Sequence, residues 1–363
     1  MEHKTLMIVG PTEIEEEILE LGAQPQVYMR TPEFTERLAA VHRNLQTVFS
    51  TQYPVVFFSS SGTGALDACV SNFIARGDEA IVINGGGFGQ RWVDICRCHG
   101  VVVHEIPVQF GKSVEIAAVE RALAEHPQAK ALLATYDETS SGALTDVKGI
   151  GELMKRQPDM LFIVDAVSAM LVEPMEPEAW GVDAVVTASQ KALAIPPGMS
   201  FMAVSPAAEA RARQVDTHGY YFSVTEALKD WRRNQTPFTP AVGLIFQLER
   251  RLEKLVTEGM DNYRARYRKL TERVRAGMAE LGFTPLADHP ANCVTGVLTG
   301  KYDASRIVSI MSQKHNIEIA PSGGEMKTKM LRVGNFGSIT EEDIDAMLAA
   351  MRETLQELDA ERN

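Results

Sequence analysis

Two charged side chains, Asp165 and Lys191, lie at the ends of apolar runs, where a charge is unexpected. Asp165 ends the apolar run DMLFIVD, and Lys191 follows the run DAVVTAS by two residues. A buried carboxylate is costly unless it is paired, so Asp165 would suit a protonated ring nitrogen of a cofactor; the alternatives are a turn cap or a pair with an arginine. A lysine among apolar neighbours can have a lowered pKa and act as an amine nucleophile. The alternative is an exposed turn lysine, which the apolar continuation ALAIPPG disfavours.

The segment SSSGTGALDA, residues 59–68, follows an apolar run and opens a helical pattern. Backbone N–H groups at a helix start, made accessible by glycine, form an anion site. Ser61, Gly62 and Thr63 are therefore a candidate phosphate cradle, unless they only cap the helix. A phosphate cradle, a carboxylate for a pyridinium nitrogen and an amine for an aldehyde together meet three needs of pyridoxal 5'-phosphate (PLP).

The elements that must position these residues form an α/β pattern. Apolar runs alternate with helical patterns, and the runs lie at residues 54–60, 79–85, 100–108, 129–136, 159–167, 183–189 and 199–205. Near-continuous apolar strands separated by helices predict a mixed, mostly parallel seven-stranded sheet covered by helices. Ligands bind beyond the carboxyl ends of such strands. We expect the loops after Phe58, Ile83, Ala134, Val164 and Thr187 to meet at the site.

A second, smaller unit is predicted towards the C-terminus. Residues 239–281 read as one long helical segment that Gly282 ends, because their apolar positions recur at three and four residues. The runs VTGVLTG, IEIAP and MLRVGNFG and a terminal amphipathic helix then indicate a smaller α/β domain. We predict a large domain over residues 16–258 and a small domain made of residues 1–15 and 259–363.

Composition narrows the class of protein. The net charge of -12 over 363 residues argues against non-specific binding to nucleic acid or an anionic membrane. No apolar run approaches the roughly 18 residues that a membrane span needs, and no signal peptide is expected. The four cysteines, Cys69, Cys96, Cys98 and Cys293, make neither a zinc pattern nor a disulfide framework. We expect reduced thiols, no metal site and a cytoplasmic location.

The ordered motifs resemble a known family. They are VGPTEI, RTPEF, SSSGTGALDA, GGGFGQRW, DETSSGAL, VDAVSAM, SQKALAIPPG and LRVGNFG. This series resembles the class V aminotransferases of PLP fold type I, most closely the alanine/serine–glyoxylate and –pyruvate aminotransferase group. The resemblance implies a PLP-dependent aminotransferase. It would move an amino group from a small amino acid such as alanine or serine to a 2-oxo acid such as pyruvate or glyoxylate, by a ping-pong mechanism.

The resemblance also implies roles around the cofactor. Lys191 matches the lysine that binds PLP covalently, and Asp165 matches the acid that pairs with the pyridine nitrogen. Val167 and Phe88 would pack on opposite faces of the ring, and Thr139 would lie beside its 3-oxygen. The cofactor phosphate would bind to Ser61, Gly62, Thr63 and Gln190.

Other matches concern the substrate and a second subunit. Arg332 matches the arginine that holds the substrate carboxylate. Thr239 matches a threonine that reaches the phosphate in the neighbouring subunit, which implies a homodimer with shared active sites. Thr236 stands where a tyrosine is common, which puts that contact in doubt. Tyr28 replaces the glycine of a Gly-His-Arg-Ser segment, and we predict that it shapes the choice of amino donor.

Three alternatives remain open. The donor could be aspartate, 2-aminoethylphosphonate or ureidoglycine. A PLP lyase or cysteine desulfurase would need a reactive cysteine on a mobile loop, but residues 320–329 have none and Cys293 lies beside a predicted strand. A PLP-fold protein used only for binding or regulation would be expected to lack Lys191 or Asp165, and both are present.

Overall fold

Seven apolar strands form one sheet in the computed structural model, which describes residues 3–216 and 219–362. Its strand order is β2-β10-β9-β8-β5-β3-β4. The strands are β2 (Val55–Phe58), β3 (Glu79–Asn84), β4 (Val102–Pro107), β5 (Ala131–Thr135), β8 (Leu161–Asp165), β9 (Ala184–Ala188) and β10 (Ser200–Val204). Strand β10 runs antiparallel to both neighbours and the other pairs are parallel. Each strand lies within an apolar run that predicted it, so the predicted sheet is confirmed.

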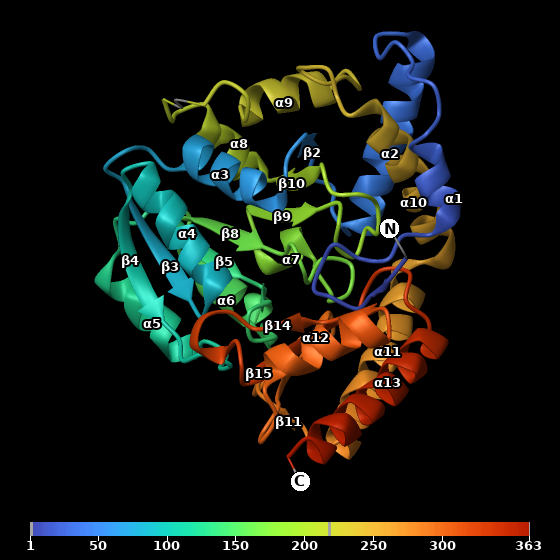
Figure 1. Ribbon diagram of the computed structural model, residues 1–363. Coiled ribbons are helices and arrows are strands. Elements are labelled where there is room, and N and C mark those ends of the chain that lie inside the picture. The colour runs from blue at the N-terminus through green and yellow to red at the C-terminus, as the bar shows by residue number, and fades with distance from the viewer. Residues whose placement is uncertain (1–2, 217–218, 363) are drawn as a thin grey trace.

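Helices cover this sheet on both faces (Figure 1). They are α3 (Gly62–Phe73), α4 (Gly87–Cys98), α5 (Ile116–Glu125), α6 (Val147–Met154), α7 (Pro177–Trp180), α8 (Pro206–Ala212) and α9 (Val224–Trp231). Because successive strand side chains point to opposite faces, Leu132 and Phe162 belong to one apolar cluster, while Leu133 and Ile163 belong to the other. Burial on both faces explains why the strands read as continuous apolar runs.

A smaller antiparallel sheet with order β11-β12-β15-β14 lies in the C-terminal part. Its strands are β11 (Thr284–Pro285), β12 (Val294–Leu298), β14 (Ala320–Pro321) and β15 (Met330–Gly334). The helices α11 (Met260–Glu280), α12 (Ala304–Lys314) and α13 (Glu341–Ala360) pack together below the large sheet in Figure 1. This is the smaller α/β unit that the sequence predicts.

The N-terminal segment packs against the C-terminal unit. Strand β1 (Thr5–Leu6) pairs in parallel with β13 (Ile317–Glu318), so the N-terminal segment lies against the C-terminal unit. The remaining elements are α1 (Glu16–Leu21), α2 (Pro32–Val48), β6 (Asp137–Glu138), β7 (Ala143–Leu144), α10 (Val242–Glu258) and the short helix η1 (Gly324–Met326). The proposed domain limits at residues 15/16 and 258/259 stay a prediction.

The single long helix expected over residues 239–281 is two helices, so this prediction is wrong in detail. Gly259 separates α10 from α11 and has a φ of 79°, a left-handed value that glycine adopts without steric cost. Periodicity alone cannot reveal such a break, because the apolar stripe continues on both sides. Gly282 follows α11 with a φ of 83°, which agrees with the predicted stop. Among the described residues, none of the helices combines the length and the apolar character that a bilayer crossing needs.

Candidate active site

A cavity of about 320 Å³ opens beyond the carboxyl ends of β2, β8 and β9. Its lining is Gly10, Pro11, Ser61, Gly62, Thr63, Leu66, Phe88, Arg91, Asp165, Val167, Gln190, Lys191 and Pro197. Eight of the twelve predicted site residues are in this set. The loops after Phe58, Ile83, Val164 and Thr187 therefore meet as expected, since parallel strands deliver their carboxyl ends to one edge of the sheet.

Lys191 projects into this cavity from the turn after β9, with 9% of its surface exposed. Its Nζ donates a hydrogen bond to the Val9 carbonyl oxygen and lies 5.7 Å from the centre of the Phe336 ring. Burial lowers the pKa of Lys191 to about 8, and the nearby Asp137 carboxylate partly offsets that shift. A lysine with this pKa is partly neutral near neutral pH and can act as a nucleophile or a base.

Gly10 leaves the space that Lys191 occupies. A Cβ atom at residue 10 would lie 2.9 Å from Cδ, Cε and Nζ of Lys191. Real Cβ atoms essentially never approach non-bonded atoms this closely. Gly10 also has a φ of 104°, which side chains with a Cβ rarely adopt. The N-terminal segment is therefore one wall of the site.

Asp165 is the last residue of β8 and is 3% exposed. Its Oδ1 accepts a hydrogen bond from the Val167 backbone N–H at 2.9 Å. Burial raises the pKa of Asp165 to about 6, and the Glu138 carboxylate adds to this shift. A buried carboxyl of this kind is stabilised in its charged form by a cationic partner.

The N-terminus of α3 faces the same cavity. Ser61 is its N-cap and makes no side-chain capping hydrogen bond, so the hydroxyl does not occupy the N–H groups of the first turn. Arg91 donates from Nη1 to the Thr63 hydroxyl at 3.1 Å, which brings a positive charge to this helix end. A Cβ added to Gly62 would lie 2.8 Å from a methyl carbon of Val167. The helix end, the guanidinium and the absence of a side chain at Gly62 together make a site for an anion.

Phe88 is held in place by a buried carboxylate. The Glu138 side chain accepts hydrogen bonds from the backbone N–H groups of Phe88, at 3.1 Å, and Gly89, at 3.0 Å. A carboxylate at this position also interacts favourably with the positive end of α4. Arg91, one helical turn further, places its guanidinium carbon 4.8 Å from the Phe88 ring centre. Val167 lines the same cavity, so a flat ring bound between Phe88 and Val167 would have apolar contacts.

Four predicted site residues stand outside the cavity lining among the residues that the structure describes, namely Tyr28, Thr139, Thr239 and Arg332. Thr139 is buried and shares a hydrogen bond of 2.8 Å with the Ser168 hydroxyl. Arg332 donates from Nη1 to the Thr139 carbonyl oxygen at 3.1 Å, and from Nη2 to the Pro321 carbonyl oxygen at 2.8 Å. Arg332 is therefore fixed between the two units of the chain, close enough to lower the pKa of Lys191.

Tyr28 and Thr239 lie elsewhere on this chain. Tyr28 is 67% exposed. Thr239 lines a separate hollow together with Phe58, Tyr221 and Phe238. Thr236 donates a hydrogen bond of 2.8 Å to the Phe238 carbonyl oxygen. The structure of one chain therefore does not bring Tyr28 or Thr239 to Lys191.

Sequence reasoning missed Gly10, Arg91, Asp137 and Glu138. All four lie in motifs that carried the family resemblance, but their roles depend on contacts with distant segments. The three-residue spacing of Phe88 and Arg91 on a predicted helix is a signal that could have found Arg91, because such residues are neighbours on a helix surface.

The comparisons with known proteins address the identity of this site. The sequence model of the family Aminotransferase class-V matches residues 12–347. The chain belongs to this family. An L-aspartate–glyoxylate aminotransferase of Paracoccus denitrificans is 30% identical over 345 residues, which cover 93% of this chain and 87% of that protein. This class-V aminotransferase also resembles the solved structure of an alanine–glyoxylate aminotransferase from Nostoc sp. That structure has a TM-score of 0.94 and 26% identity, with 98% of this chain and 96% of that chain covered.

Another relative of the class-V aminotransferase bears an unrelated name. A protein of Synechococcus sp. described as the small subunit of a soluble hydrogenase is 33% identical over 359 residues. These residues are 97% of this chain and 93% of the Synechococcus protein.

The seven-stranded sheet and the smaller C-terminal unit agree with the fold of the class-V family.

Proposed function

We propose that this class-V aminotransferase binds PLP on Lys191 and transfers the amino group of a small amino acid to glyoxylate or a similar 2-oxo acid. One observation carries the proposal. Lys191 and Asp165, two buried ionisable groups whose pKa values are shifted towards neutrality, line a single cavity that also receives the N-terminus of α3. Ionisable groups perturbed in this way gather at functional sites.

The residues present fit PLP. The N-terminus of α3 and Arg91 would hold the phosphate, because backbone N–H groups and a guanidinium both bind phosphate oxygens. The Asp165 carboxylate would accept a hydrogen bond from the protonated ring nitrogen, and Phe88 and Val167 would pack on the ring faces. Thr139 would lie near the 3-oxygen, and Gln190 would add to the phosphate site. When bound, PLP supplies the electron sink that makes the α-carbon of an amino acid acidic.

The work of the chain itself is to bind, orient and move protons. The Lys191 amine, lowered to a pKa of about 8, would take the α-proton of the substrate and return it, so one group is both base and acid. Lys191 sits at the end of β9 under the wall that Gly10 forms, which restricts the path of Nζ. Burial at the end of β8 keeps the Asp165 carboxylate at a fixed place, where it can face the ring nitrogen of PLP.

Arg332 would bind the carboxylate of the substrate. Its guanidinium has five N–H donors, and the carbonyl groups of Pro321 and Thr139 hold it in one orientation. Donors that remain on Nη1 and Nη2 are suited to a bidentate carboxylate. Burial lowers the pKa of Arg332, and the Asp137 and Glu138 carboxylates oppose that shift, which keeps the guanidinium charged.

The choice of glyoxylate as acceptor has support from two relatives, since the names of both the Paracoccus and the Nostoc proteins specify it. Alanine, serine and aspartate are the candidate donors. The test is the visible absorbance of the purified holoenzyme. A productive donor should shift the band, glyoxylate should restore it, and Lys191→Ala should do neither. A wild-type band that no amino acid in a broad panel changes would contradict the proposal.

Two other activities have less support. A desulfurase requires an accessible thiolate, but Cys293 is fully buried, and burial raises its pKa well above the ordinary value. The hydrogenase name of the Synechococcus relative would suggest a metal centre held by cysteine thiolates. In the described part of the chain, the group of side chains that could hold a metal contains no cysteine.

A homodimer with shared active sites remains part of the proposal. Exposed aromatic side chains surround the segment of Thr239: Tyr220 is 83% exposed, and Tyr221 stacks on Phe238 at 5.1 Å between ring centres. A second subunit would cover such a surface. Mixing Lys191→Ala and Thr239→Ala chains tests shared sites. Loss of activity in both parents, with partial recovery in the mixed dimer, is expected, and a mixture no more active than its parents would contradict it. A cytoplasmic location also stays a prediction, which agrees with the free cysteines among the described residues.

A further inference from the structure

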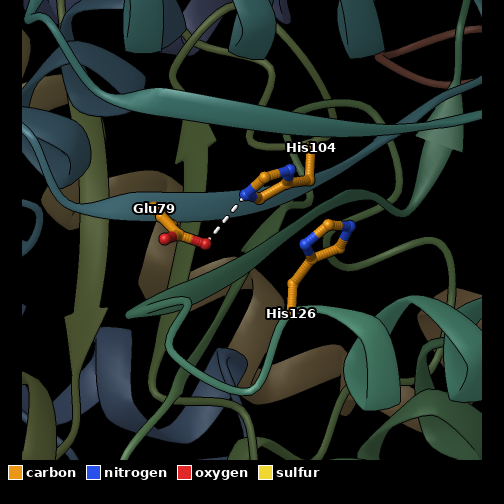
Figure 2. A group of neighbouring side chains, drawn as sticks. All are labelled: Glu79, His104 and His126. Atoms are coloured by element: carbon orange, nitrogen blue, oxygen red, sulfur yellow. Dashed lines mark hydrogen bonds and ion pairs between the residues drawn. The ribbon is translucent and has the colours of Figure 1, made fainter.

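A cluster of two histidines and a glutamate lies away from the cavity of Lys191. Glu79 begins β3, His104 lies in β4, and His126 is the C-cap of α5 (Figure 2). Glu79 pairs with Val102, and Ile81 pairs with His104. Glu79 and His104 therefore point to the same face of the sheet, diagonally across two strands. Helix α5 brings His126 to that face.

The three side chains already lie close to one another. His104 Nε2 is 2.9 Å from Glu79 Oε2, and the rings of His104 and His126 stack with centres 3.6 Å apart and planes 12° apart. One ligand atom from each residue lies within 4.8 Å of the other two. Figure 2 shows a nitrogen of each ring on the side towards the Glu79 carboxylate. All three residues are half-buried, so an ion in solution can reach them.

We propose that Glu79, His104 and His126 form a binding site for a divalent transition-metal ion of the zinc class. Two imidazole nitrogens and one carboxylate oxygen are a recurrent protein ligand set for Zn²⁺, with water at the fourth position. Nitrogen and oxygen donors of this kind also bind Ni²⁺ and Cu²⁺. The sequence gives no sign of the site, because its residues are separated by 25 and 22 positions and only the sheet register brings them together.

Binding requires a small rearrangement. Ligand bonds of about 2.0–2.2 Å in a tetrahedral site place the ligand atoms about 3.3 Å apart, whereas the three candidate ligand atoms are known to lie within 4.8 Å of one another. An ion lies in the plane of each imidazole that binds it, so the two stacked rings must tilt apart. The half-buried setting of all three side chains allows such rotations. Strand β4 is at the edge of the sheet, which leaves room for water on the open coordination position.

The site is separate from the proposed chemistry. Glu79 is at the amino end of β3, whereas the cavity of Lys191 lies beyond the carboxyl ends of the strands. A bound ion would join β3, β4 and the end of α5. Because it would bind only the folded chain, the ion is expected to stabilise the protein in proportion to its concentration above the dissociation constant, and to leave the amino-transfer reaction unchanged.

The test measures zinc binding to holoenzyme that has been treated with a chelator and dialysed. Calorimetric titration with ZnCl₂ should give one more binding event in the wild type than in His126→Ala or His104→Asn. Loss of one ligand should weaken that event by at least roughly tenfold, since even the loss of a group that only supports a ligand costs 10- to 100-fold. Thermal unfolding should show a zinc-dependent rise in Tm in the wild type that His126→Ala and His104→Asn lack.

The matched control is His99→Ala. His99 Nε2 lies 2.9 Å from Asp67 Oδ1, so this pair has the same hydrogen bond as Glu79–His104 but belongs to no cluster of three ligands among the described residues. His99→Ala should bind zinc like the wild type. The exposed Cys98 thiol is present in every variant and contributes an equal background. Equal zinc binding and equal Tm shifts in the wild type and His126→Ala would overturn the proposal, and so would a wild type without zinc-dependent change.

Discussion

Cys293 donates a hydrogen bond from Sγ to Asp137 Oδ2 at 3.1 Å, and both side chains are buried. This contact joins the C-terminal sheet to the segment after β5, beside the cavity of Lys191. Burial raises the pKa of Asp137 to about 7, and the hydrogen bond from Cys293 opposes that shift. The Asp137 charge in turn raises the pKa of Lys191 against the larger effect of burial. Asp137 therefore adjusts the fraction of neutral amine without lining the cavity.

Asp137→Asn should lower the pKa of Lys191 below about 8, because the substitution removes the carboxylate that favours the protonated amine. The measurement is the pH dependence of acylation of Lys191 in cofactor-free protein, followed by peptide mass analysis. Asp183→Asn is the control, since Asp183 is a half-buried carboxyl just before the amino end of β9, away from Lys191, and burial raises its pKa as well. A midpoint in Asp137→Asn that is unchanged or higher would disprove this role.

Asp165→Asn should stabilise the cofactor-free chain and lower the activity of the holoenzyme. The pKa of Asp165 is about 6 in the folded chain against an ordinary 3.8, so stability is lost as pH rises from about 4 to 6 and stays low above that range. Asparagine avoids this cost of roughly 2–3 kcal/mol and keeps an oxygen for the Val167 N–H. We expect a higher Tm at pH 8, no gain near pH 4, and a loss in kcat of at least roughly a hundredfold.

The contrary outcome for Asp165→Asn is a Tm difference that does not depend on pH. Such a result would mean that ionisation of Asp165 does not lower the free energy of unfolding. A rise in the Tm of the wild type on addition of PLP is a second measurement, because a cationic partner should remove the free-energy cost of the Asp165 charge.

Arg332→Lys should weaken substrate binding although the charge is kept. Lysine cannot reproduce the planar fork that Pro321 and Thr139 orient. Loss of a charge-assisted hydrogen bond should lower kcat/KM for amino donors by roughly 10- to 100-fold. PLP content should remain near one per chain, and a neutral amine that lacks a carboxylate should react equally well in both proteins. Unchanged kcat/KM in Arg332→Lys would remove Arg332 from the substrate site.

Tyr28→Gly should change the relative kcat/KM values of alanine, serine and aspartate. Tyr28 is 67% exposed in one chain, so the effect of this substitution on stability should stay within about 0.5 kcal/mol. The proposed effect on donor choice would require a second subunit that brings Tyr28 to the site. Val102→Ala, at an exposed apolar side chain on the edge strand β4, is the control for loss of apolar surface. The same donor profile in Tyr28→Gly and in the wild type would refute the assignment.

The large sheet and most of the site could be predicted because they depend on local patterns. Continuous apolar runs define the buried strands. Asp165 ends one such strand, and Lys191 and Ser61 lie within three residues beyond the ends of two others. Asp137 and Cys293 could not be paired from the sequence, since they come from different units of the chain. The roles predicted for Tyr28 and Thr239 would require a second subunit, because the structure of one chain does not bring either residue to Lys191.

Two further features escaped the sequence for related reasons. Glu138 caps α4 through backbone N–H groups, and sequence patterns do not report how a distant loop meets a helix end. The predicted domain limit at residues 258/259 falls where α10 ends, but the helical pattern did not predict the break itself, because a single glycine within a helical stripe is often tolerated.

The central claim is a covalent bond between the Lys191 amine and PLP. The most direct measurement is to reduce fully loaded holoenzyme with borohydride, digest it and determine the masses of all lysine peptides. The account predicts that only the peptide with Lys191 carries the added mass of the reduced cofactor, and that Asp165→Asn loaded with PLP carries it at the same position. An unmodified Lys191 in fully loaded wild-type protein, or the added mass on another lysine, would contradict the account.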